Sequence, residues 1–185
     1  METFLGYKFG RPHSRGFEIV LGSGGMETVN PEILDARRPY DHEELLVLLR
    51  YHPLMMTRVV SIDWDPHNRS GHGALHAEYD ITANYVRAMA KANLVSPCEQ
   101  ALAFYLHQAL AIPASARTHL IYARGVSYRG DVSIPDDMEF LGIWVDIQYL
   151  DVHDTYADAY GGACVGHSRT KTLVQVQNLV VRIEV

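Results

Sequence analysis

Cysteine and positive charge are both scarce in this sequence. Only two cysteines, Cys98 and Cys164, occur among the 185 residues. Their spacing does not match that of the cysteine and histidine ligands of a zinc site. One disulfide would be optional in a chain long enough to bury a sizeable core, so we expect reduced thiols and a cytoplasmic protein. The formal net charge of −6 excludes the broad basic face that nonspecific nucleic-acid binding requires, but it leaves room for a local basic patch.

Long apolar runs and targeting signals are also missing. No apolar run approaches the roughly 20 residues that cross a bilayer, and the first residues lack the charged, apolar and small-residue layout of a signal peptide. We therefore expect no membrane span. The sequence LGSGG at Leu21–Gly25 lacks the lysine and the second glycine of a phosphate-binding loop, so we interpret it as a flexible turn.

The segment Ser96–Ile112 organises the rest of the chain. Ser96 suits the N-cap of a helix, Pro97 its first turn, and Glu99 the third position of a capping box. Beyond Glu99 the predicted helix has no continuous polar face, and a helix that is apolar on all sides is buried on all sides. In a chain of this length, the simplest way to bury such a helix is to wrap a sheet around it.

Strand patterns lie on both sides of this helix along the chain. Two shorter strands joined by a long loop precede it, three long strands follow it, and a further helix comes before them all. The predicted elements are a helix at 41–51 and strands at 54–63, 74–82, 119–128, 138–150 and 170–185, with the acidic, tyrosine-rich segment 151–168 as a loop.

One long central helix inside a strongly curved antiparallel sheet is the α+β architecture of the hotdog fold. We expect a single hotdog domain over residues 1–185 with an N-terminal helical extension, in which 1–40 are irregular and 41–185 form the core. Hotdog domains usually pair sheet edge to sheet edge, which removes an exposed edge. We therefore expect a homodimer or a higher homo-oligomer, with the pocket at the interface.

The stretch LLRYHPLMMTRVVSID at Leu48–Asp63 resembles the opening of the hydroxyacyl-carrier-protein dehydratases, which are hotdog enzymes. Those enzymes carry a catalytic histidine before the helix and an acidic residue about two turns into it. Here the segment before the helix has no histidine, and Ala103 stands at the acidic position. Ordinary dehydration is therefore excluded.

A second stretch resembles the FcoT-like long-chain fatty acyl-CoA thioesterases. Its elements are Ile81, the triplet Tyr85-Val86-Arg87 and the early helical Glu99, and the later pattern over Ala123–Val145 also fits. The resemblance implies a site of two tyrosines and an asparagine, which would be Tyr85, Tyr51 and either Asn93 or Ser96. The histidine of that family's loop is absent here.

Thioester hydrolysis needs an acyl pocket, a donor for the oxyanion and a group that directs water. The first amides of a buried helix can supply the donor, and the candidates are those of Cys98, Glu99 and Gln100. The Glu99 carboxylate could orient or deprotonate water, or it could only close the capping box. An exposed Cys98 thiol at a helix N-terminus would have a lowered pKa, with His52 or His107 as a possible base.

Basic residues suggest where the thiol portion of a substrate would bind. Arg87 could meet a phosphate or a carboxylate, and His52, Arg124 and Arg129 are further candidates for substrate binding. Arg117, Arg169 and Lys171 could join them at a cleft edge, unless all of these residues are scattered surface charge. His72 and His76 do not match a zinc pattern, so we expect no metal and no cofactor.

Three functions remain open at this point. The first is hydrolysis of an acyl thioester carried on coenzyme A (CoA) or on an acyl carrier protein. The second is the addition of an amine to an enoyl thioester before release, with which some FcoT-like proteins are associated. The third is a non-catalytic acyl-binding module.

Overall fold

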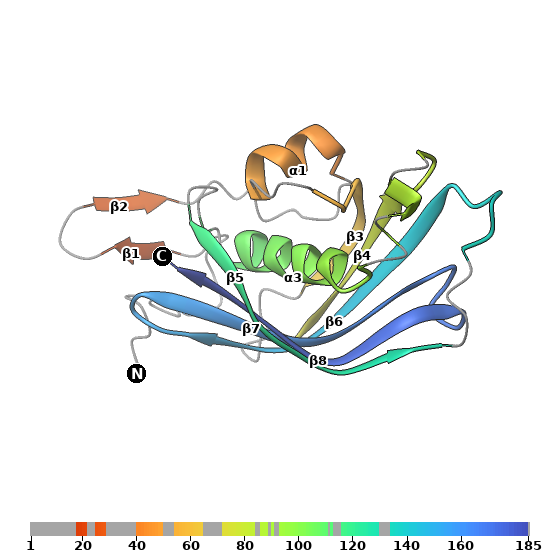
Figure 1. Ribbon diagram of the computed structural model, residues 1–185. Helices are drawn as coiled ribbons and strands as arrows, with labels where there is room; N and C mark the ends of the chain where they lie inside the picture. Colours follow the sequence, from red (N-terminus) through yellow and green to blue (C-terminus); the bar gives the residue numbers. More distant parts are fainter. Residues whose placement is uncertain are drawn as a thin grey trace.

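The computed structural model describes residues 18–21, 25–28, 40–49, 54–64, 72–83, 86–88, 90, 93–110, 112, 116–129 and 134–184. Helix α3 (Ser96–Ala109) crosses the concave side of a curved sheet (Figure 1). All of its residues from Pro97 onward are buried except Glu99. The apolar positions around the helix are therefore matched by contacts on every side.

The sheet has six antiparallel strands in the order β3-β4-β6-β7-β8-β5. A curved antiparallel sheet with a helix on its concave side is the hotdog arrangement, and the predicted curved sheet is confirmed (Figure 1). The strands are β3 (Arg58–Trp64), β4 (Gly73–Asp80), β5 (Arg117–Tyr128), β6 (Phe140–Val152), β7 (Tyr156–Gly166) and β8 (Thr172–Glu184).

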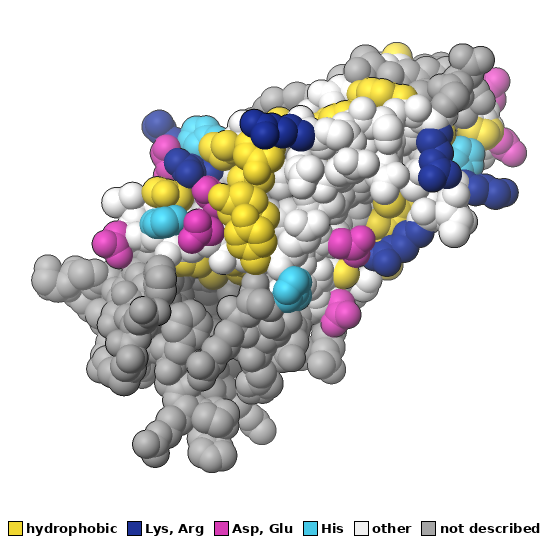
Figure 2. All heavy atoms as spheres, turned by 90° about the horizontal axis from the view of Figure 1, so that it is seen from below, with side chains coloured by type: hydrophobic (Ala, Val, Ile, Leu, Met, Phe, Trp, Pro, Cys, Tyr) yellow, Lys and Arg dark blue, Asp and Glu magenta, His cyan; other side chains and the backbone are white. Residues whose placement is uncertain are grey.

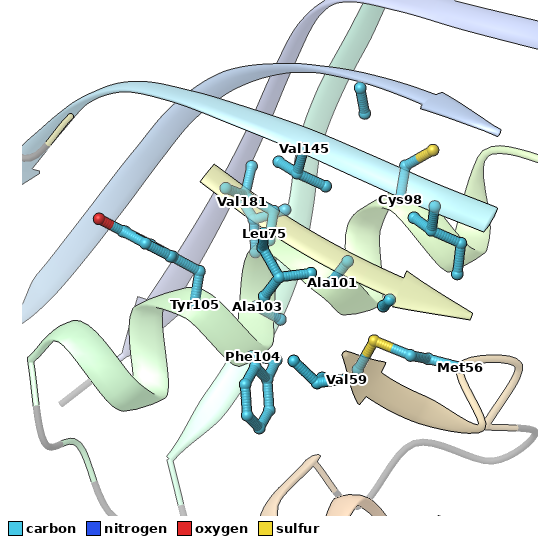
Figure 3. Close-up of a cluster of buried hydrophobic side chains, with 14 of the residues drawn as sticks. Met56, Val59, Leu75, Cys98, Ala101, Ala103, Phe104, Tyr105, Val145 and Val181 are labelled. Carbon is cyan, nitrogen blue, oxygen red and sulfur yellow. The ribbon is translucent and has the colours of Figure 1, made fainter. Parts of the chain in front are cut away.

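The core lies between α3 and the concave face of the sheet. Small helix residues such as Ala101 and Ala103 face large side chains from the strands, including Leu75, Val145 and Val181 (Figure 3). Burying a leucine- or valine-sized side chain contributes about 1.5–3 kcal/mol, so this layer supplies much of the driving force for folding.

Strand β7 corrects the prediction that 151–168 form a loop. Glycine, alanine and aspartate are poor strand formers, which is why the segment resembles a loop in the sequence. Five of its buried residues nevertheless alternate along the strand, Ala157, Ala159, Gly161, Ala163 and Val165, whereas the buried Asp158 between two of them pairs with Arg182. These small residues let α3 approach the middle of the sheet closely, so packing overrides local propensity.

The N-terminal part also differs from the expected irregular extension. Strands β1 (Glu18–Leu21) and β2 (Gly25–Thr28) pair as an antiparallel hairpin. Tyr40 pairs with Val59, and its ring packs edge-on against Phe104 at 5.0 Å, so the core begins at Tyr40. Helix α1 (His42–Leu49) lies on the side of α3 away from the sheet (Figure 1).

Among the described helices, none is both long enough and apolar enough to cross a bilayer.

Candidate functional site

The start of α3 lies at one defined end of the sheet. The end of β4 pairs with the start of β6 through Asp80 and Phe140, and the β7–β8 turn and the end of β5 follow at the same end. The Gln100 side chain, in the first turn of α3, accepts hydrogen bonds from the amides of Met55 and Met56 at 2.8 and 3.2 Å, just before β3. This end of the sheet therefore gathers the helix start, the β7–β8 turn, the end of β5 and the segment that enters β3 (Figure 1).

Gln100 holds a neighbouring segment through its buried side chain, whereas the sequence predicted a role only for its backbone amide. Its side chain is 3% exposed, and its two bonds to backbone amides fix the segment entering β3. Gln100 is one of two buried glutamines in this otherwise apolar helix, with Gln108, and such residues are a signal because a buried amide needs hydrogen-bond partners. The sequence could not say which backbone groups those partners would be.

Asn93, rather than Ser96 with Glu99, caps the start of α3. The Asn93 carbonyl oxygen accepts from the amides of Val95 and Ser96, both at 3.1 Å, and its amide group donates to the Ser96 hydroxyl at 2.7 Å. Val95 occupies the N-cap position with helical dihedral angles and makes no side-chain cap bond. The predicted capping box is wrong because Ser96 is already inside the helix.

The predicted oxyanion donors are reduced to one. The Glu99 amide donates to the carbonyl of Val95 at 3.1 Å. Gln100 lies one residue further along, where a helical amide bonds to the carbonyl four residues earlier. Of the three predicted amides, the Cys98 amide is the one for which the described hydrogen bonds contain no acceptor.

The Cys98 thiol does not have the properties of a nucleophile. It is completely buried, its sulfur lies 3.6 Å from the carbonyl oxygen of Leu94, and burial raises its pKa. His107 is also buried, which lowers its pKa, and its Nδ1 lies 3.1 Å from the Ile112 carbonyl, to which it donates. The condition for an activated thiol, an exposed Cys98, is therefore not met, and desolvation acts against the thiolate.

Glu99 is the half-buried acidic residue of the first turn of α3. It is the one residue of this turn after Pro97 that is not fully buried, so its carboxylate reaches the boundary between core and solvent. A carboxylate that is only partly buried keeps access to water, as a general base needs.

Arg87 clamps a distant loop onto the helical segment 86–88. Its guanidinium donates to the backbone carbonyls of Pro135, Asp136 and Met138, just before β6. The Tyr79 hydroxyl reinforces the segment by donating to the Val86 carbonyl at 3.4 Å. The arginine of the Tyr-Val-Arg triplet thus shapes the loop next to the helix start.

The basic residues predicted to bind the substrate lie in different parts of the molecule. The Arg129 amide donates to the Leu173 carbonyl at 3.0 Å, so Arg129 lies beside the β7–β8 turn with Arg169 and Lys171, at the helix-start end. Arg169 pairs with Asp146 at 3.2 Å. Arg124 lies on the opposite face of the sheet, where it stacks over the Tyr122 ring at 4.8 Å. Arg117 lies at the far end of β5.

Three predicted site residues, Tyr51, His52 and Tyr85, lie outside the described residues. In the part of the chain that the structure describes, no group of three or more histidine, cysteine or acidic residues could hold a metal ion. His76 stacks on Trp144 with ring centroids 5.1 Å apart, so its ring packs against an aromatic neighbour.

No protein-family model matches the chain, and no curated protein matches it in sequence. Several solved structures are similar to it. One is the dehydratase heterocomplex ApeI:P from Xenorhabdus doucetiae, at 14% identity over 74% of this chain and 88% of that chain, with a TM-score of 0.48.

Two further similar structures are a conserved protein from Pseudomonas aeruginosa and a thioesterase family protein from Silicibacter pomeroyi. The first is 9% identical over 67% of this chain and 88% of that chain, with a TM-score of 0.41. The second is 12% identical over 66% of this chain and 83% of that chain, with a TM-score of 0.33. Likenesses at this level assign neither a family nor an activity.

Proposed function

We propose that this protein is a thioesterase that hydrolyses a fatty or polyketide-type acyl thioester, on CoA or on an acyl carrier protein, at the start of α3. The supporting observation is that the half-buried Glu99 carboxylate stands at the first turn of a helix that is otherwise enclosed by core residues. An acyl chain lying along the helix would place its thioester near this turn. Hotdog resemblance in the sequence favours the same chemistry.

In this proposal Glu99 orients and deprotonates the attacking water, and the Cys98 amide donates to the developing oxyanion. Tyr85 and Tyr51, carried over from the family resemblance, donate to the thioester carbonyl. Asn93 fixes the start of the helix through its side-chain hydrogen bonds, so we assign it a positioning role.

The thiol portion of the substrate would leave toward the β7–β8 turn. Arg129 and Lys171 are exposed there, at the same end of the sheet as the helix start, and they could bind phosphate groups of CoA or of a phosphopantetheine arm. Arg87 shapes the neighbouring loop through its three carbonyl contacts, and His52 stays a candidate for substrate binding from the sequence alone.

The copies would associate through β5, one of the two edge strands of the sheet. This strand has twelve residues and carries exposed Leu120, Ile121, Val126 and Tyr128. A long apolar edge invites pairing with another strand. We propose a homodimer in which two β5 strands meet.

The test is release of free thiol from a panel of saturated and 2-enoyl thioesters, with mass analysis of the acid. The wild type, Glu99→Gln and the control Glu139→Gln are compared, each checked for folding by circular dichroism. Glu139 is exposed at the same end of the sheet, so its change removes a carboxylate there without altering α3. We expect Glu99→Gln to lose 100-fold or more of the rate, a typical loss for a general base being about 10²–10⁴-fold.

Product mass separates the two enzymatic functions, because hydrolysis gives the unchanged acid and amine addition gives a β-amino acid. A folded Glu99→Gln protein with wild-type rates would remove Glu99 from the mechanism. No thiol release by the wild type, together with thermal stabilisation by acyl-CoA, would replace the thioesterase with the acyl-binding module.

A further inference from the structure

The convex face of the sheet, opposite α3, carries an aromatic row that crosses four strands. Tyr122 on β5 pairs with Val180 on β8, which pairs with Tyr160 on β7, which pairs with Tyr149 on β6. The rings of Tyr149 and Tyr160 stack at 4.2 Å, and Val180 is only 2% exposed beneath this row. Figure 2, which views the molecule from below the sheet, shows a hydrophobic stripe on this face.

Tyr160, in the middle of the row, is neutral at physiological pH. Burial and then the nearby Asp158 carboxylate raise the pKa of Tyr160 to about 12. The Tyr149 side chain is 45% exposed. Aromatic side chains that are stacked, uncharged and open to solvent are typical of the centre of a protein interface.

Charges on either side of the row are segregated by strand. On β5 the outward-facing residues include Arg124 and His119, which are basic and exposed. On β6, Asp151 lies in the same cross-strand row as His119, and Asp146 pairs with Gly162 on β7, at the register shift that lies opposite Asn178, the β8 partner of Arg124. On both sides of the tyrosine row the named residue on β5 is therefore basic and the one on β6 is acidic.

We propose that this convex face binds a second copy of the same chain, related by a two-fold axis that runs along the strands between β7 and β8. Such an axis exchanges β5 with β6 and β8 with β7 while keeping each row in place. Arg124 then faces Asp146 of the second copy, Tyr122 faces its Tyr149, and His119 faces its Asp151.

The alternative two-fold axis, across the strands, is disfavoured by charge. It would keep each strand opposite itself, so that basic β5 residues would face basic β5 residues and aspartates would face aspartates. Like charges brought together at an interface cost binding energy. The segregation of charge therefore selects the axis along the strands.

The partners already present within one chain are compatible with this contact. Asp146 pairs with Arg169, Asp151 lies 3.1 Å from His153, and His119 lies 3.6 Å from Glu184, but the side chains in all three pairs are substantially exposed. Exposed ion pairs contribute little, so a second cation is not excluded by them. Aligned sheets pack about 10 Å apart and cross at about 30°, and long arginine side chains can bridge the offset at the rim.

Charge reversal tests the proposed axis. Arg124→Asp alone would place two like-charged pairs in the interface, and Asp146→Arg alone would do the same. An equimolar mixture of the two variants would restore opposite charges at both pairs of a mixed dimer. We expect each variant to weaken self-association at least tenfold, and the mixture to recover most of it, as measured by sedimentation velocity over a dilution series.

The control is Asp137→Arg, which makes the same charge change as Asp146→Arg in an exposed turn away from this face. All variants are checked for unchanged melting temperature. The proposal would be overturned if Arg124→Asp associated as strongly as the wild type, or if the mixture associated no more strongly than its components. It would also be overturned if the wild type did not self-associate, or if its association were unaffected by these changes. The proposal does not depend on the thioesterase activity.

Discussion

At the scale of single residues, Asn93 shows how a helix start can depend on a side chain outside the helix. Its carbonyl oxygen accepts hydrogen bonds from two backbone amides at once. A capping box would otherwise satisfy free amides at the helix start. The residue also precedes the candidate Glu99 by less than two helical turns. A change at Asn93 would therefore act on stability first and on activity through the helix start.

Asn93→Ala should lower the free energy of unfolding by about 1 kcal/mol, the usual cost of losing a cap. Ser96→Ala removes one contact to Asn93 while leaving both backbone amides satisfied, so it should cost less. Asn93→Asp keeps the accepting oxygen and should restore most of the loss. Urea unfolding of the three variants measures this series.

The opposite result would be equally informative. If Asn93→Ala kept the full stability but lost thiol release, Asn93 would contact the substrate directly, as the family resemblance implies. The residue would then be a catalytic residue rather than a positioning residue.

At the scale of elements, the sequence predicted α1, five strands of the six-stranded sheet and the stretch that forms α3. Each of these has a periodic pattern of large apolar residues, and such a pattern is set by the burial of that element alone. The remaining strand of this sheet, β7, has no such pattern because most of its buried residues are small. Their size reflects how closely α3 approaches, which is a property of the packed molecule.

Only the part of the candidate site that leaves a local pattern in the sequence could be predicted. Glu99 was identifiable because it is the acidic exception in an apolar helix. The Asn93 cap, the Gln100 anchor and the Arg87 clamp join segments up to 51 residues apart. No local pattern in a single sequence encodes which backbone groups such side chains will meet.

Two neighbouring glycines of β7 allow the packing of this strand to be tested. A Cβ at Gly161 would lie 2.7 Å from the carbonyl oxygen of Asp146, whereas at Gly162 the nearest atoms would lie 3.5 Å away. Gly161→Ala should destabilise the protein by about 1–3 kcal/mol, the typical cost of overpacking. Gly162→Ala should be neutral or stabilising by up to about 1 kcal/mol, because alanine loses less conformational entropy.

The melting temperatures of the two variants and the wild type, measured side by side by thermal unfolding, test this prediction. Equal losses at both positions would mean that the close approach of the Asp146 carbonyl does not distinguish Gly161 from Gly162, and our account of the packing at Gly161 would be wrong.

At the scale of the whole molecule, the exposed edge and the convex face predict two separable contacts. Ile121 is 44% exposed on the edge strand β5, and a lysine on an edge strand opposes pairing with another strand. Ile121→Lys should therefore disrupt the proposed edge dimer while leaving the convex-face contact intact. Arg124→Asp should do the reverse.

Light scattering of the two single variants and their combination distinguishes these contacts. If both contacts exist, each single variant forms dimers and the combination is monomeric. A wild-type mass for Ile121→Lys would show that β5 is not the edge at which copies meet.

The position of β8 has a consequence for how the chain is made. β8 is hydrogen-bonded on one side to β7 and on the other to β5, yet it follows both in the sequence. During synthesis, β5 has no neighbour in the sheet until residues up to Glu184 have left the ribosome. Until then the apolar helix α3 lacks part of its cover, so newly made chains would depend on a fast final step, or on chaperones, to avoid association through exposed helices.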